Sequence, residues 1–307
     1  MRRGLAGVVR GPDNTRQQPA GGVAGADTPA VGTSEGWPGA VPDERTRQWH
    51  SAHVENAGFY TIRAPDRAYF LARLRSPVVA AIAALGRAHG RPLTILEVGC
   101  GSGADSVCLA LQGHDVTTID PSEHLLARAR GLADVAAALF PARPLRLRVE
   151  RGNVFDLPGA AGRYDVVLSF GVVVLWREEE RRLRALANLR ATLNPGGWLV
   201  LGTTNTTHPL FKLLPLIPLV ADLADHNLAI MEGEVRQAGF AVVDRGAVGL
   251  SEHFDQWLAN RLARFPLRLA DRVFARLPAG WQLPVAPHVF VVARASGGGR
   301  RDGAGFG

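Results

Sequence analysis

The sequence is poor in cysteine. Its 307 residues include only two, Cys100 and Cys108, and both lie in one short segment. Two cysteines cannot staple a domain of this size, so a disulfide scaffold and a cysteine-rich zinc site are excluded. We therefore expect a reducing compartment and a cytoplasmic location, with both thiols packed as small apolar groups.

Long apolar runs and basic tails are also missing. Residues 210–224, the most apolar stretch, include Lys212, Pro215, Pro218 and Asp222, so they do not predict the ~20-residue helix that spans a bilayer. The net charge is +7, but residues 1–44 carry four Arg against five acids. Residues 296–307 carry two Arg against one acid. Neither end resembles a nucleic-acid-binding arm, so no nucleic-acid partner is expected.

The two ends of the chain have little to bury. Residues 1–44 contain nine Gly, five Pro and a single aromatic residue, Trp37. Such a composition cannot offset the conformational entropy lost on folding. The sequence therefore predicts a disordered tail at 1–44, one folded domain at 45–295 and a second disordered tail at 296–307.

Strand-like and helix-like segments alternate within that domain. This order predicts an α/β fold with a mostly parallel sheet covered on both faces. The predicted strands are residues 93–98, 115–119, 145–150, 164–170, 198–203, 240–248 and 288–293, and the predicted helices are 104–112, 122–139, 177–193 and 230–238.

Three glycines follow the first predicted strand at alternate positions, Gly99, Gly101 and Gly103. Such a loop permits a tight turn and lets a ligand approach the backbone without meeting a Cβ atom. Asp120 closes the next strand, where a carboxylate can accept hydrogen bonds from both hydroxyls of a ribose. A nucleoside-like ligand is therefore expected across the carboxyl ends of these two strands.

Two ligand classes fit this loop. Gly99, Gly101 and Ala104 satisfy the dinucleotide pattern G-x-G-x-x-G/A, which leaves an NAD-type oxidoreductase open. Glu97 favours a different ligand, because a pyrophosphate has no use for a carboxylate beside the glycines. A cation such as an amino-acid ammonium suits it better.

Several segments together resemble one family. The run LEVGCGSG at 96–103, followed by the acid at 120, is similar to the class I S-adenosylmethionine-dependent methyltransferases, near the small-molecule group of ubiquinone and menaquinone methyltransferases. The resemblance implies a Rossmann-like fold with a seven-stranded, mostly parallel sheet. A helical insertion before the last strand is expected from the length of residues 249–287, where the family often has a short hairpin. Further resembling segments are GNVFDLP at 152–158, YDVVLS at 164–169, LNPGGWL at 193–199 and EVRQAGF at 234–240.

The resemblance also implies S-adenosylmethionine as the cofactor. Glu97 and the glycine loop would contact its methionine portion, and the backbone ending the fourth strand would receive the ammonium. Asp120 would hold the ribose, and the segment after the third strand would flank the adenine, with Asn153 where the family usually carries Asp. The implied cofactor-binding residues are Glu97, Gly99, Gly101, Gly103, Asp120, Pro121, Asn153, Val154, Ser169 and Phe170.

The methyl acceptor is expected to be a small molecule. Ser169-Phe170-Gly171-Val172 stands where adenine-N6 and glutamine methyltransferases carry Asn/Asp-Pro-Pro-aromatic, and a single lysine excludes a two-lysine mechanism. The predicted domain carries no Asp-Asn pair of the metal-dependent catechol type, so no metal is expected. O-methylation is favoured over N- or C-methylation, and a non-catalytic S-adenosylmethionine-binding protein stays an alternative. The candidate bases or orienting residues are His208, His53 and Tyr60.

Residues 249–287 form a long insertion before the last predicted strand. Arginines at 261, 264, 268, 272 and 276 recur every three or four residues, which places them on one side of a helix. A lid over the acceptor with solvated arginines is the first interpretation. Peripheral contact of residues 252–277 with an anionic membrane is the second.

Overall fold

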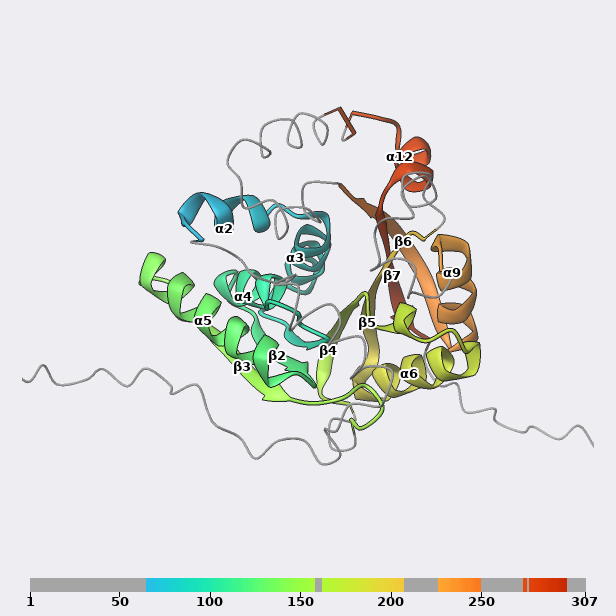
Figure 1. Ribbon diagram of the computed structural model, residues 1–307, viewed down its shortest axis with the longest axis horizontal. Helices are drawn as coiled ribbons and strands as arrows, with labels where there is room; N and C mark the ends of the chain where they lie inside the picture. Colours follow the sequence, from blue (N-terminus) through green and yellow to red (C-terminus); the bar gives the residue numbers. More distant parts are fainter. Residues whose placement is uncertain (1–64, 158–161, 207–225, 250–272, 275, 297–307) are drawn as a thin grey trace, which may run out of the picture. The chain divides into compact units, whose positions relative to one another are not determined.

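A computed structural model describes residues 65–157, 162–206, 226–249, 273–274 and 276–296. Seven strands form one sheet in the order β3-β2-β1-β4-β5-β7-β6 (Figure 1). Strand β7 runs antiparallel to both of its neighbours, and the remaining pairs are parallel. The predicted class I methyltransferase fold is confirmed. The strands are β1 (Thr94–Val98), β2 (Asp115–Asp120), β3 (Arg146–Arg151), β4 (Tyr164–Phe170), β5 (Leu193–Thr204), β6 (Phe240–Val248) and β7 (His288–Ala295).

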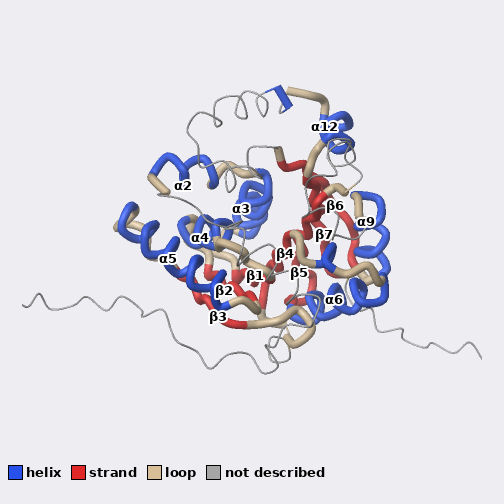
Figure 2. Tube along the Cα trace, in the orientation of Figure 1, coloured by secondary structure: helices blue, strands red, loops and turns tan. Residues whose placement is uncertain are grey.

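Helices cover both faces of this sheet (Figure 2). On one face lie α3 (Pro77–His89), α4 (Ala104–Leu111) and α5 (Glu123–Leu139), and on the other lie α6 (Glu179–Thr192) and α9 (Leu228–Gln237). Successive strand residues point to opposite faces of the sheet. Ile95 therefore packs in the core with α3, α4 and α5, and Leu96 packs in the core with α6 and α9. Both side chains are fully buried, and each stabilises the fold by about 1.5–3 kcal/mol relative to exposure.

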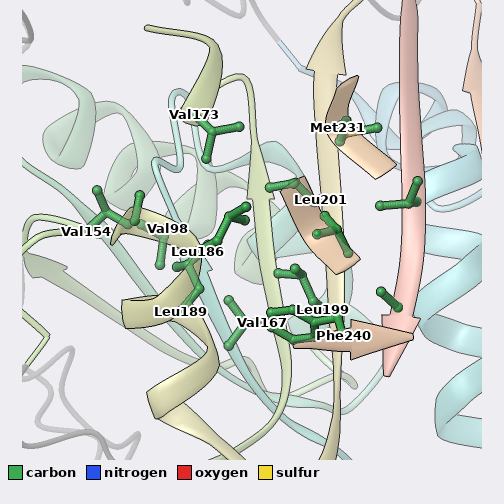
Figure 3. Packing of buried hydrophobic residues seen from close by; sticks show 14 of the residues in the cluster. Val98, Val154, Val167, Val173, Leu186, Leu189, Leu199, Leu201, Met231 and Phe240 are labelled. Atoms are coloured by element: carbon green, nitrogen blue, oxygen red, sulfur yellow. The ribbon is translucent and has the colours of Figure 1, made fainter. Parts of the chain in front are cut away.

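Figure 3 shows the core beneath α6 and α9. Val167 and Leu199 of neighbouring strands lie in one cluster with Leu186 of α6 and Met231 of α9. These residues fix the strands whose carboxyl ends carry the candidate site. Cys100 and Cys108 are both buried free thiols, which confirms their expected packing role.

Two helices that the sequence analysis did not assign precede the sheet. They are α2 (Arg67–Arg73) and α3, and their signals are present in the sequence. The Ser76 hydroxyl accepts from the Val79 amide at 3.3 Å as the N-cap of α3, Pro77 takes the first turn, and Gly90 ends the helix with a φ of 65°. A Ser-Pro start and a Gly stop are standard helix boundaries.

Strand β5 begins earlier than predicted. The segment Asn194-Pro195-Gly196-Gly197, which precedes the strand predicted at 198–203, lies within β5, where the pairing with β4 shifts register. Tyr164 pairs with Leu193, and Val166 then pairs with Trp198. Gly196 has a φ of 71°, a backbone conformation that accommodates the extra residues of such a bulge.

The insertion between β6 and β7 is described only in part. It contains α12 (Ala279–Val285). Most of the arginine series, the predicted tail at 1–44 and residues 297–307 of the second predicted tail lie outside the described residues. Across the described ranges no single helix is long and apolar enough to cross a membrane. The pair α2 and α3, bent by 67°, meets the criterion by length and composition only.

Candidate functional site

The glycine loop joins β1 to α4 at the carboxyl edge of the sheet. Gly99, Gly101 and Gly103 have φ values of 80°, 54° and 75°. The amides of Gly99 and Cys100 donate to the Ile119 carbonyl at 2.9 and 3.3 Å, which holds the loop against the end of β2. A Cβ on Gly99 would lie 2.2 Å from Val172 Cγ2, so only glycine fits there.

Asp120 faces this loop from the end of β2. Its Oδ1 accepts from the Ser122 amide at 2.9 Å, and its Oδ2 accepts from the Gly101 amide at 3.4 Å. The α5 N-cap is Ser122, whose hydroxyl accepts from the Leu125 amide, so Asp120 is not used as a helix cap. Burial raises the pKa of Asp120 to about 7, against the lowering effect of the two amide donors. A hydroxyl donor from a ligand would favour its ionised form.

Glu97 is buried under the loop. Its carboxylate accepts from the hydroxyl of Ser106 on α4 and, at 3.3 Å, from that of Thr118 on β2. Burial, reinforced by the Asp105 carboxylate, raises the pKa of Glu97 to about 8. In this arrangement Glu97 ties three elements together at the loop, and its predicted contact with an ammonium stays a prediction.

Arg73 of α2 is a contributor that the sequence analysis missed. Its Nε and Nη2 donate to the two carboxylate oxygens of Asp105 at 3.0 and 3.1 Å. Asp105 lies in the first turn of α4, directly after the glycine loop. This bidentate ion pair therefore fastens α2 beside the loop. The available clue in the sequence was the Ser-Pro start of α3, downstream of Arg73, which indicates a helical segment in this region.

The predicted adenine side follows β3. The Asn153 Oδ1 accepts from the Phe155 amide at 3.1 Å, and the Asn153 carbonyl accepts from the Asp156 amide at 3.0 Å. Val154 is buried, and its carbonyl accepts from Asn188 Nδ2 at 3.0 Å. Asn153 thus shapes its own turn, and an Asp at this position could accept the same hydrogen bond from the Phe155 amide. Pro121 is half-buried at the end of β2.

The end of β4 forms the next wall. The Ser169 hydroxyl donates to the Val98 carbonyl at 3.1 Å and ties β4 to β1. The Phe170 ring packs edge-on against His288, with ring centroids 5.7 Å apart. A Cβ on Gly202 would lie 2.1 Å from the Phe170 ring, so β5 needs glycine to admit it.

A buried polar network lies beyond the carboxyl end of β5, and the sequence analysis did not anticipate it. His226 Nδ1 lies 2.9 Å from the Thr203 hydroxyl, and its Nε2 lies 3.1 Å from Glu234 Oε2. Arg182 donates from Nε and Nη2 to Glu234 Oε1 at 2.8 and 2.7 Å. Burial raises the pKa of Glu234, but hydrogen bonds from His226 and Arg182 hold it below its ordinary value overall.

Hydrogen bonds between Thr206 and His226 also join the two described residues that flank 207–225. The His226 amide donates to the Thr206 hydroxyl at 2.8 Å, and the Thr206 amide donates to the His226 carbonyl at 3.1 Å. Residues 207–225, which include the predicted base His208, lie between these two anchors and outside the described residues. His53 and Tyr60 also lie outside them. Within the ranges that the structure covers, no cluster of three metal-ligating side chains occurs.

Comparisons with known proteins agree with this geometry. Residues 95–197 match the family described as a methyltransferase domain. The ubiquinone biosynthesis O-methyltransferase of Azorhizobium caulinodans is 32% identical over 39% of this chain and 44% of its own length. That of Caulobacter sp. strain K31 is 33% identical over 45% of this chain and 50% of its own length. The chain therefore spans about half the length, or less, of these relatives.

The fold has a counterpart among solved structures. Magnesium protoporphyrin IX methyltransferase from Synechocystis PCC 6803, with bound S-adenosylmethionine, aligns at a TM-score of 0.50 and 17% identity, over 84% of this chain and 99% of that one. The likeness concerns the fold alone. Residues 95–197 thus match a methyltransferase-domain family, and the sheet that contains them has the strand order of the class I methyltransferase fold.

Proposed function

We propose that this protein transfers a methyl group from S-adenosylmethionine to a small-molecule acceptor, with O-methylation as the favoured reaction. The observation that carries the proposal is the buried Asp120 carboxylate, held by the Gly101 amide over a loop of positive-φ glycines. The names of the ubiquinone biosynthesis relatives support an oxygen acceptor.

The residues present fit this cofactor. The Cβ-free loop admits a ligand against the backbone. Among the described residues Asp120 accepts from two amides, so its oxygens keep capacity for ribose hydroxyls. When bound, S-adenosylmethionine supplies a methyl group already activated on a sulfonium. The residues of this chain then orient the reactants and exclude water. Such positioning can supply ~7–11 kcal/mol of the barrier.

Strand order argues against the NAD-type alternative. Dinucleotide-binding domains of the Rossmann type use the order 3-2-1-4-5-6 with parallel strands. Here an antiparallel β7 lies between β5 and β6.

Calorimetric titration tests the cofactor. We expect S-adenosylhomocysteine to bind and NAD not to bind. Asp120→Ala should weaken S-adenosylhomocysteine binding about 10- to 150-fold, because a charge-assisted contact contributes ~1.5–3 kcal/mol. Asp134→Ala is the matched control, because it also replaces Asp by Ala and Asp134 is exposed on α5. Equal affinity in both variants would remove the assignment.

Methyl transfer is measured separately. Labelled S-adenosylmethionine is incubated with a panel of hydroxyl, amine and carbon acceptors, and label entering a phenol or alcohol supports O-methylation. Tight cofactor binding without transfer to any acceptor in the panel or in cell extract would favour the non-catalytic alternative. His208→Ala, His53→Ala and Tyr60→Phe then test the three candidate bases, and a base should shift the pH profile of turnover.

A further inference from the structure

A cleft of about 760 Å³ lies at the edge of the sheet opposite to the glycine loop. Its floor is formed where β1, β2 and β3 begin, and its walls are the C-terminal ends of α3 and α4. Five residues of β1 separate it from the loop, about 16 Å at 3.3 Å per residue. The cleft is therefore separate from the proposed methyl-transfer site. The residues used below are Arg87, Arg91, Gln112, His114, Arg143 and Arg146, all of which line it.

The lining of this cleft is basic and contains no acidic residue. Arg91 is neutralised by Asp165, which accepts from both of its terminal nitrogens at 2.8 Å. Arg87, Arg143 and Arg146 form no ion pair with the acids of the described ranges. The neighbouring Asp115 forms an ion pair with Arg148, with 3.0 Å between Asp115 Oδ1 and Arg148 Nη2. Three guanidinium charges are thus left around one cleft.

Compensation of helix dipoles does not account for these charges. The C-terminal ends of α3 and α4, at His89 and Leu111, each carry about half a negative charge. The two helix ends offset about one of the three guanidinium charges, so about +2 remains. An anion in the cleft would meet that excess.

Two neutral hydrogen-bonding side chains, His114 and Gln112, also line the cleft. His114 Nδ1 accepts from the Leu93 amide at 3.1 Å, so the proton of the neutral ring lies on Nε2. Burial lowers the pKa of His114, which keeps the ring a neutral donor. The buried Oε1 of Gln112 has no hydrogen-bond partner among the described residues, so a hydroxyl or water is needed there.

We propose that this cleft binds a ligand carrying a phosphate group, at a site distinct from that of methyl transfer. Guanidinium groups match phosphate oxygens in pairs, and the cleft has the volume of a typical small-molecule site, about 300–1,000 Å³. Arg143 and Arg146 provide the charged contacts from the segment before β3 and its first residue. His114 adds a donor from below.

Calorimetric titration of the full chain with sodium pyrophosphate tests this site. Saturable binding of one equivalent is expected at low ionic strength. Arg143→Gln and Arg146→Gln should each weaken it about 10-fold or more, as for other contacts to charged groups. Arg75→Gln is the matched control. Arg75 is exposed before the other end of α3, about 18 Å away along a 13-residue helix, and should change the affinity less than about 2-fold.

Two outcomes would overturn the site: no saturable binding of pyrophosphate, or an equal loss in all three variants. The replaced side chains are exposed, so an unchanged thermal midpoint confirms folding. S-adenosylhomocysteine affinity should not change in these variants, which separates this test from that of the proposed function.

Vesicles identify the source of the phosphate. Binding to phosphatidic-acid vesicles that pyrophosphate displaces, and that Arg143→Gln weakens, supports a lipid headgroup at the site. Pyrophosphate binding without such vesicle binding supports a soluble phosphorylated ligand.

Discussion

Replacing Glu234 by Gln should destabilise the protein far more than replacing Glu232, two residues earlier on the same helix. Glu234 neutralises Arg182, and their side chains are only 5% and 7% exposed. Two further guanidinium bonds of Arg182 go to the Trp176 and Arg177 carbonyls at 2.8 and 2.7 Å, so the side chain cannot leave for water. Glu234→Gln therefore leaves a buried cation without its counter-ion.

The structure sets the expected magnitude. Removing one partner of a buried ion pair costs about 3–5 kcal/mol. For a domain of this size each kcal/mol lowers the thermal midpoint by about 2–4 °C, so Glu234→Gln should lower it by about 6–20 °C. Glu232 also pairs with two arginines, Arg236 and Arg245, but their side chains are 52% and 43% exposed. Water can solvate them after Glu232→Gln, which should cost less than about 1 kcal/mol.

Thermal and urea unfolding of both variants measure the difference. Replacing both partners, Arg182→Met with Glu234→Met, should cost less than the sum of the single changes, because no uncompensated charge remains. The pKa of Glu234 is lowered in the folded protein, so its contribution is present above the unfolded value of about 4.3 and is lost as pH falls through the folded value. Equal midpoints for Glu234→Gln and Glu232→Gln would refute the reasoning.

Three further predictions concern the cofactor site and the insertion. Gly99→Ala should abolish S-adenosylhomocysteine binding, because its Cβ would meet Val172 Cγ2 and its φ is 80°; unchanged affinity in titration would contradict this. Asp120 has a pKa of about 7, so cofactor binding at pH 7 should release about half a proton as hydroxyl donors favour the carboxylate. Calorimetry in buffers of different ionisation heat measures this release, and a result independent of buffer would count against it. If residues 252–277 contact membranes, Arg268→Gln, Arg272→Gln and Arg276→Gln together should reduce co-sedimentation with anionic vesicles at low salt; no reduction leaves only the lid.

Much of the fold was predictable because its signals are local. Strands β4 and β6 have the predicted boundaries, and α5, capped by Ser122, lies within the helix predicted at 122–139. Alternation of buried residues and short glycine turns depends on neighbours in sequence, so a single chain displays it. The bulge in β5 was not predictable, because it is defined by pairing with β4, about 30 residues away.

The candidate site divides in the same way. Asp120 and the glycine loop are recognisable because one β1-α4-β2 unit brings them together at the ends of adjacent parallel strands, where the Gly101 amide donates to Asp120. The buried network could not be inferred, since Arg182, Thr203, His226 and Glu234 come from α6, β5, a connecting segment and α9. Only tertiary packing makes a histidine before α9 the partner of a threonine in β5. The roles of His208, His53 and Tyr60 remain predictions.

The antiparallel β7 has a consequence for how the protein can vary. Because β7 runs opposite to β5 and β6, Val248 and Thr204 both pair with His288, at the edge that carries the glycine loop. Any segment inserted after β5 or between β6 and β7 must therefore leave and re-enter the domain at the cofactor side. Lengthening such a connection costs little, about 0.6 kcal/mol for each doubling of a flexible loop. The ladder of β5, β7 and β6 can thus stay constant while the connections that leave this edge are exchanged, so their length and sequence can vary separately from the stability of the sheet.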